Sequence, residues 1–386
     1  MLPEILFLAC ALILLYTYFG YILLVQILGA IRPSMRTNRN SCHEVLDSRT
    51  PRVSFIIAAR NEEKHIQQKL QNTLNLDYPA EKLEIIIASD ASDDDTETIA
   101  AKYSDRGVKV VRLQRRAGKT AAQNAAVRQA SGEILIFSDA TTHYRPDVLR
   151  RLLEMFDPEG QVGCVCGHLT YQEDADERYE EQRYYWNREV NLRIMESRLG
   201  FIPGVAGCIY AVRKSAYNFL EPYAVSDFLQ PLAIGYRDLR VIYQPAAIAV
   251  EQRSPDLITD FHRRRRTIAR ALNGLVRNTH YINPFKNKFR AIQVFSHKVL
   301  RWFSPFFLIL LVITAQYLDL PGLGLALLTL LCILILTGIV GIAVRNYPLG
   351  RWLRAPAFFL LANVSSMLAV WDWLRGEQYV TWEPQR

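Results

Sequence analysis

The apolar residues of this chain are gathered at its two ends, and this uneven distribution restricts the fold more than any other feature. An apolar run from Ile5 to Ile31 is long enough to cross a bilayer. Further apolar runs near the C-terminus cover Trp302 to Leu318, Leu323 to Val344 and Ala355 to Trp373. Nearly all charged residues lie between the two ends. The pattern therefore predicts a polar domain held between membrane segments.

The first run, residues 1–31, is interpreted as an anchor. No basic segment precedes it and no small-residue cleavage site follows it, which argues against a secretion signal. Arg32, Arg36 and Arg39 come directly after it. Since basic residues favour the cytoplasmic side, we expect a multi-pass protein of the inner (plasma) membrane. Residues 32–50 would form a linker to a cytoplasmic catalytic domain.

The C-terminal third is divided into three parts. Residues 281–301 mix basic and aromatic side chains and are typical of an amphipathic interfacial helix, although a solvated basic linker is an alternative. Residues 302–374 would hold two or three transmembrane segments, the last of which is polar enough to be ambiguous. The tail, 375–386, would lie outside if all three segments cross and inside if the last one is re-entrant.

Composition limits the partners. The 386 residues carry a formal net charge of +8, which suits an anionic partner such as a phospholipid headgroup, a lipid phosphate or a nucleotide diphosphate. Nucleic acid would leave the apolar runs unexplained. The six cysteines form no disulfide or metal framework. Cys164 and Cys166 alternate along an expected strand and are interpreted as buried thiols on one face of a sheet.

The middle of the chain alternates between short apolar runs and polar helical segments. This pattern predicts an α/β domain with a mostly parallel central sheet covered on both faces. The expected strands are Val53–Ala59, Leu83–Ser89, Val108–Leu113 and Ile134–Ser138, and the expected helices between them are 61–74, 96–103 and 119–130.

Polar residues follow the expected strands at the edge where parallel sheets bind ligands. Asp90 follows the second strand and Asp139 follows the fourth. A carboxylate at this edge, beside a diphosphate, is suited to hold Mg²⁺ or Mn²⁺. Lys119, after Gly118 at the start of a helix, would add a positive charge. Asp93–Asp95 is interpreted as a helix start.

Several motifs in sequence order resemble the family 2 inverting glycosyltransferases with the GT-A fold, in particular their membrane-integrated bacterial branch related to cellulose, chitin and hyaluronan synthases. The resemblance runs from about Val53 to Leu275. It rests on the segments 53–63, 88–96, 118–124, 137–149, 204–213 and 226–246. It implies a catalytic domain over residues 51–280. P-loop and dinucleotide-binding motifs are absent from the sequence.

The resemblance also implies roles for individual residues. Asp227 would be the general base, and Arg266 would grip the diphosphate. The donor nucleotide-sugar would be bound by Ala59, Asn61, Glu62, Asp90, Lys119, Asp139 and Arg263, with Asp139 as the metal ligand.

Two positions depart from the family pattern. The metal turn is Asp139-Ala-Thr141, where a second acid is common, and Arg263 to Thr267 stands where polymerising members carry Q-x-x-R-W. The second departure makes transfer of a single sugar as reasonable as polymerisation. The expected function is inverting transfer from a nucleotide-sugar, with UDP as the favoured nucleotide, to a lipid-linked or growing polysaccharide acceptor. An inactive membrane scaffold that keeps the nucleotide-binding fold is the alternative.

Overall fold

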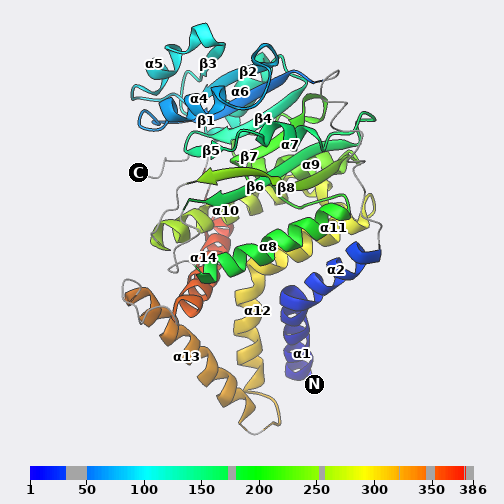
Figure 1. Cartoon of the computed structure of the whole chain (residues 1–386). Coiled ribbons are helices and arrows are strands. Elements are labelled where there is room, and N and C mark those ends of the chain that lie inside the picture. Colours follow the sequence, from blue (N-terminus) through cyan, green and yellow to red (C-terminus); the bar gives the residue numbers. More distant parts are fainter. Residues whose placement is uncertain are drawn as a thin grey trace.

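The computed structural model describes residues 1–31, 50–172, 180–251, 257–320, 322–344, 353–377 and 379, and the side chains of 180–187 and 257 are outside this description. The predicted linker and most of the predicted tail lie outside these ranges. The centre of the molecule is an eight-stranded sheet in the order β3-β2-β1-β4-β7-β6-β8-β5 (Figure 1).

The first four strands are parallel neighbours, as predicted. They are β1 (Val53–Ala59), β2 (Leu83–Ser89), β3 (Val108–Arg112) and β4 (Ile134–Asp139). The other half of the sheet is mixed, because β7 (Ile209–Arg213) runs antiparallel to both β4 and β6 (Val162–Tyr171). The short β5 (Thr142–Tyr144) runs antiparallel to β8 (Arg240–Glu251), whereas β6 and β8 are parallel.

Helices cover both faces of the sheet, because the central strands are apolar on both sides. On one face α4 (Ile66–Leu74), α5 (Thr96–Ala101) and α7 (Val148–Leu153) pack against Val53, Phe55 and Ile57. The other face carries α6 (Lys119–Gln129), α9 (Ser226–Tyr236) and part of α10 (Leu257–Arg277). Cys164 and Cys166 are buried together on this second face, which confirms their interpretation as core thiols.

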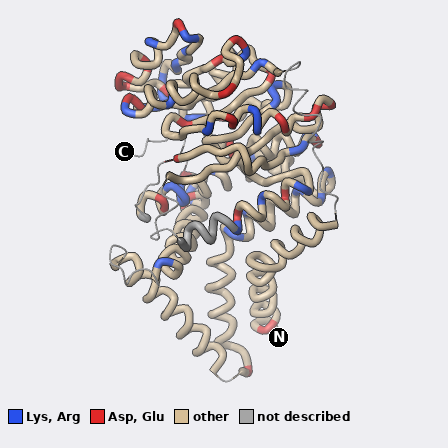
Figure 2. The backbone as a smooth tube through the Cα atoms, in the orientation of Figure 1, with Lys and Arg blue, Asp and Glu red and all other residues tan. Residues whose placement is uncertain are grey.

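Among the described residues, four helices are long and apolar enough to cross a membrane: Leu2–Ile31, Lys288–Ala315, Leu323–Ala343 and Arg354–Leu374. They extend from one side of the sheet domain and carry little charge, whereas the domain carries most of it (Figure 2). The first consists of α1 (Leu2–Leu15), a π-helical turn and α2 (Tyr21–Ile31). The third is α13 (Leu323–Ala343).

The second long helix differs from the expected division at residue 301. Here α11 (Lys288–Val294), a π-helical turn (Phe295–Val299) and α12 (Leu300–Ala315) form one continuous helix. Its first half is not a free surface helix, because Gln293, Ser296 and His297 are buried. It lies beside α8 (Glu180–Arg198), which also packs on α2 (Figure 1).

Charged side chains join these three helices in what we call the anchor cluster. The Tyr21 hydroxyl donates to Glu196. His297 lies between two carboxylates, with Nδ1 2.9 Å from Glu196 and Nε2 2.9 Å from Glu189. Arg301 donates to the second oxygen of Glu189 at 3.0 Å. The N-terminal anchor is therefore fixed to the catalytic domain through polar contacts.

The last long helix, α14 (Arg354–Leu374), runs alongside α10 of the catalytic domain (Figure 1). Arg265 of α10 donates to Asp372 of α14 through Nε at 2.6 Å and Nη2 at 2.5 Å. Tyr379, the last described residue, donates to the same carboxylate at 2.9 Å. The start of the tail is thus attached to the end of α14, beside α10, and the side of the membrane on which it lies stays a prediction.

Candidate active site

The parallel half of the sheet brings the predicted acidic residues to one edge. In the register of the ladder, Ala58 of β1 pairs with Asp139 of β4, and Ala59 pairs with Ser89 of β2. Asp90 follows directly, and its N–H donates to the Ala59 carbonyl at 3.1 Å. The two carboxylates therefore flank the end of β1, on the edge where the sequence predicts ligand binding.

Asp90 organises the loop that precedes α6. Its buried carboxylate accepts the backbone N–H groups of Ala117 at 2.7 Å and Gly118 at 2.9 Å. Gly118 has φ 95°, a conformation that favours glycine. Asp90 thus sets the position from which Lys119 begins the helix, and its predicted contact with the donor nucleotide-sugar stays a prediction.

The turn after β1 is tied to the turn after β2. Asn61 has φ 53°, which asparagine tolerates better than most residues, and its side chain accepts the Asp93 N–H at 2.9 Å. The Glu62 N–H donates to Thr96 at 2.7 Å. These contacts hold residues 61–65 out of the predicted helix, which begins only at Ile66. Asp94 accepts the Thr96 N–H at 3.1 Å and Asp95 is the N-cap of α5, which confirms the interpretation of Asp93–Asp95 as a helix start.

Glu62 presents a buried carboxyl group at this edge. Its side chain contacts His65 at 3.0 Å. Burial raises the pKa of Glu62, with Asp139 and Asp94 adding to the effect and His65 opposing it. Glu62, which follows Ala59 and Asn61 at the end of β1, therefore lies close enough to Asp139 for the two carboxyl groups to interact.

Lys119 and Asp139 form an ion pair at the centre of this edge. The ammonium donates to the Asp139 carboxylate and, at 3.3 Å, to the Gly207 carbonyl. Burial alone would lower the pKa of Lys119, but the nearby carboxylates of Asp139 and Asp227 outweigh it and raise the pKa. The side chains remain 21% and 33% exposed, so both are open to a ligand.

Asp227 lies in the first turn of α9, close to this ion pair. Burial raises the pKa of its carboxyl group, while Lys119 and Arg270 oppose the shift. The carboxylate approaches the backbone of Gly207 so closely that an added Cβ there would be 2.6 Å from Oδ2. A carboxylate whose pKa is raised by its site is suited to accept a proton.

Helix α10 supplies arginines along this edge. Arg263 lies 3.6 Å from Asp260, and its charge acts on Tyr171 and Glu251. Arg270, one turn after Arg266, carries a charge that acts on Asp227. The guanidinium of Arg270 also donates to the Ala224 carbonyl at 3.0 Å. Arg266 lies between these two positions, and its predicted role stays a prediction.

Two residues of this edge were not predicted from the sequence. Glu251 ends β8, opposite Thr142 of β5, and its carboxyl pKa is raised by burial and by Asp139. Lys69 of α4 is fully buried and donates to the Thr142 carbonyl at 2.5 Å. Burial lowers the pKa of Lys69 to about 7. Neither residue belongs to a local motif; strand pairing and helix packing bring them to the site.

The residues at this edge are compatible with a divalent cation that is held by a protein carboxylate together with the phosphate oxygens of a ligand. Within the described ranges no three His, Cys, Asp or Glu side chains converge as a ready-made metal site. The Thr141 hydroxyl is directed to Glu251 at 3.5 Å. Asp139 offers a carboxylate that is 33% exposed, and Mg²⁺ often binds through one or two carboxylates plus phosphate oxygens and waters.

Comparisons with known proteins agree with this architecture. The model of the family "Glycosyl transferase family 2" matches residues 54–220. Poly-beta-1,6-N-acetyl-D-glucosamine synthases of Staphylococcus epidermidis and Staphylococcus aureus are 26% identical over 202 residues, which is 51% of this chain and 48% of theirs. The chain thus matches about half the length of these curated relatives.

A solved structure supports the fold. A mannosyltransferase from Pyrobaculum calidifontis, in complex with GDP-Man and Mn²⁺, superposes with a TM-score of 0.68 at 20% identity. The match covers 97% of this chain and all of that one. The fold is therefore the GT-A fold, and residues 54–220 of this chain match the model of glycosyl transferase family 2.

Proposed function

We propose that this chain is an inverting glycosyltransferase that moves a sugar from a nucleotide-sugar to a lipid-linked or growing polysaccharide acceptor at the cytoplasmic face of the inner membrane. The observation that carries the proposal is the convergence of Lys119, Asp139 and Asp227 at the ligand-binding edge of a family 2 domain. The curated relatives, which are synthases of a polysaccharide, support the class of product.

The reaction would be a direct displacement at the anomeric carbon. Asp227 accepts the proton of the acceptor hydroxyl, and the hydroxyl oxygen forms a bond to the anomeric carbon. The bond from that carbon to the diphosphate oxygen breaks on the opposite face, and the nucleoside diphosphate keeps the electron pair. An α-linked donor then gives a β-linked product.

Charge at the leaving group would come from Lys119 and from a cation. When the donor binds beside Asp139, the Lys119 ammonium can turn from the carboxylate to the diphosphate oxygens. A divalent cation held by Asp139 would neutralise the same oxygens as a Lewis acid. The Mn²⁺ in the mannosyltransferase structure supports this cofactor class. Arg263 and Arg266 remain proposed diphosphate ligands, and Ala59, Asn61, Glu62 and Asp90 proposed nucleoside contacts.

A donor screen on membranes that contain the full chain tests the proposal. Radiolabelled UDP- and GDP-sugars are offered, and the product is sized. We expect label in a polymer or in a lipid-sized product, and the size separates polymerisation from single transfer.

The Asp227→Asn variant tests the assignment of the base. It should lower transfer by about 10²–10⁴-fold and keep nucleotide binding. Unchanged transfer in this variant would refute the mechanism. A labelled product of the opposite anomeric configuration would refute the inverting displacement.

A further inference from the structure

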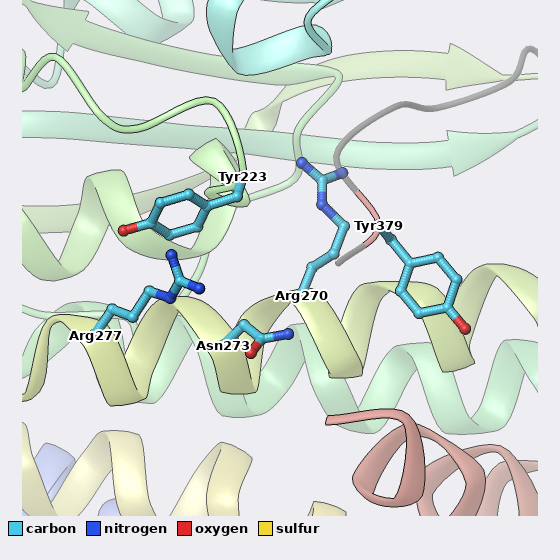
Figure 3. Close-up of a pocket in the computed structure, with 5 residues that line it drawn as sticks. All are labelled: Tyr223, Arg270, Asn273, Arg277 and Tyr379. Carbon is cyan, nitrogen blue, oxygen red and sulfur yellow. The ribbon is translucent and has the colours of Figure 1, made fainter. Parts of the chain in front are cut away.

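A small pocket lies between α10 and the segment that follows α14 (Figure 3). It is lined by Tyr223, Arg270, Asn273, Arg277 and Tyr379. Two of these side chains are guanidinium cations, the other three carry hydroxyl or amide donors, and none is acidic. In Figure 3 both arginines extend from the same side of α10 toward the domain. The chemistry of the lining is that of an anion site.

The pocket residues of α10 form one face of the helix. Arg270, Asn273 and Arg277 are spaced i, i+3 and i+7, which aligns them along the axis. The opposite face of α10 meets α14, where Arg264 lies 4.8 Å from the Phe358 ring and Arg265 pairs with Asp372. The arginines that face the domain are therefore not those that fix α10 to α14.

Arg270 has donor capacity left after its protein contacts. Nη2 donates to Ala224, yet the buried Nε has no hydrogen-bond partner among the described residues. Thr120 of α6 donates to the same Ala224 carbonyl at 2.7 Å, which fixes this carbonyl between the two helices. A buried guanidinium N–H without an acceptor is costly, and an oxyanion in the pocket would satisfy it.

Arg277 lies at the open end of the pocket. Its side chain is exposed, and its guanidinium stacks on Tyr223 with 4.5 Å between the guanidinium carbon and the ring centroid. This stacking holds the guanidinium in the pocket mouth without using its N–H groups. The other two lining residues are already engaged, since Asn273 donates to the Glu377 carbonyl at 3.2 Å and Tyr379 to Asp372.

The pocket adjoins the proposed base through Arg270, whose charge acts on Asp227. The leaving diphosphate, by contrast, is expected at Asp139, where Lys119 already supplies a cation. A second set of cations next to the base is therefore better matched to an acceptor than to the donor. We propose that Arg270 and Arg277 bind a phosphate or diphosphate group carried by the acceptor lipid. This inference rests on the proposed function and narrows its acceptor class.

Binding to the full chain in nanodiscs tests the inference, with radiolabelled geranylgeranyl diphosphate as the probe. Arg277→Gln should weaken binding by about tenfold or more, as expected for a lost charge-assisted hydrogen bond. Arg277→Lys, which keeps the charge, should recover part of the loss. The matched control is Arg264→Gln, on the α14 side of the same helix, which should bind like the unchanged chain.

The competitors separate the possible sources of the phosphate. Geranylgeraniol and inorganic pyrophosphate should both displace the probe poorly, and Arg277→Gln should leave UDP and GDP affinity unchanged. Loss of nucleotide affinity in Arg277→Gln would assign the pocket to the donor and overturn the inference. Displacement by pyrophosphate as effective as by the lipid would assign it to a free anion, with the same consequence.

The inference and the proposed function fail separately. Asp227→Asn should keep probe binding while it loses transfer. Probe binding that is insensitive to Arg277→Gln, in a chain whose transfer still depends on Asp227, would reject only the pocket. Transfer that does not depend on Asp227 would reject only the mechanism.

Discussion

The molecule concentrates charge in two places that differ in burial. In the anchor cluster, Glu189, Glu196 and His297 are at most 7% exposed, and each carboxylate has at least two hydrogen-bond partners. The second place, which we call the reaction cluster, consists of Lys119, Asp139, Asp227, Glu251 and Arg270. Its Lys119 and Asp139 side chains are 21% and 33% exposed.

The electrostatic environment of the carboxylates differs in the same way. Burial would raise the pKa of Glu189, but His297, Lys298 and Arg301 outweigh it and hold the pKa well below its usual range. For Asp227 and Glu251 burial prevails, and the pKa is raised. Saturated pairing fixes a charge in place, whereas incomplete pairing leaves a carboxylate able to exchange a proton or a ligand. The first cluster is structural, and the second is suited to chemistry.

The largest effect is expected in the anchor cluster. Glu189→Gln removes the carboxylate that pairs with Arg301 and with Nε2 of the buried His297, which then keeps only Glu196, and should lower the free energy of unfolding by about 3–5 kcal/mol. Thermal unfolding in detergent measures the loss. Asp77→Asn, which breaks the exposed pair with Arg150, is the control and should cost less than about 1 kcal/mol. Equal effects of the two variants would contradict the structural role.

Lys119→Met should show the opposite of Glu189→Gln, with a large loss of transfer rate and little loss of stability. Removal of the ammonium leaves the leaving diphosphate without a fixed cation, so the transfer rate should fall by about 10²–10³-fold, or roughly 3–4 kcal/mol of barrier. Thermal stability should change little, because the pair is partly solvated. Lys109→Met, whose exposed ammonium pairs with Glu84, is the matched control. A large drop in stability without a kinetic defect would place Lys119 with the structural charges.

Gly207→Ala tests how closely the reaction cluster is packed. The new methyl group would meet the Asp227 carboxylate and should shift it, at a cost of about 1–3 kcal/mol that appears mainly in transfer kinetics. Gly204→Ala is the matched control in the same loop, because its added Cβ would make ordinary contacts of 3.6 Å and 3.9 Å. If both variants are equally active, the close approach of the Asp227 carboxylate to Gly207 does not matter for transfer.

The smallest effect concerns the pH profile. Asp227 acts as a base only when ionised, and its pKa is raised, so kcat/KM should fall as pH decreases through that raised value. Arg270 stabilises the ionised form. Arg270→Gln should therefore raise the pKa further and move the acidic limb to higher pH, whereas Arg264→Gln should leave the limb in place. An unmoved limb in Arg270→Gln would show that this guanidinium does not act on the base.

Local sequence predicted most of the parallel half of the sheet. β1 and β2 have the predicted bounds, and β3 and β4 end within one residue of them. This half is predictable because each buried strand is a continuous apolar run between polar helices, and both signals lie within a few residues. Asp90 and Asp139 at the strand ends follow from the same pattern.

The mixed half of the sheet was not predictable in this way. β7 enters between β4 and β6, and β8 returns to pair with β5, so partners are far apart in sequence. The pairing of β8 with β5 brings Glu251 close enough to Asp139 for their charges to interact. The helix that continues through residue 301 buries Gln293, Ser296 and His297 against partners distant in sequence, and no local pattern reveals such a cover.

By itself, the sequence determined the kind of chain: apolar ends long enough for a membrane, a parallel α/β core and acidic strand ends. These features depend on composition and on contacts between near neighbours. Only the tertiary structure decided which charges act together. The charge of Arg270 acts on Asp227, the Asp227 carboxylate fits closely against Gly207, and His297 is enclosed by Glu189 and Glu196. Electrostatic effects depend on distance and burial, and packing sets both.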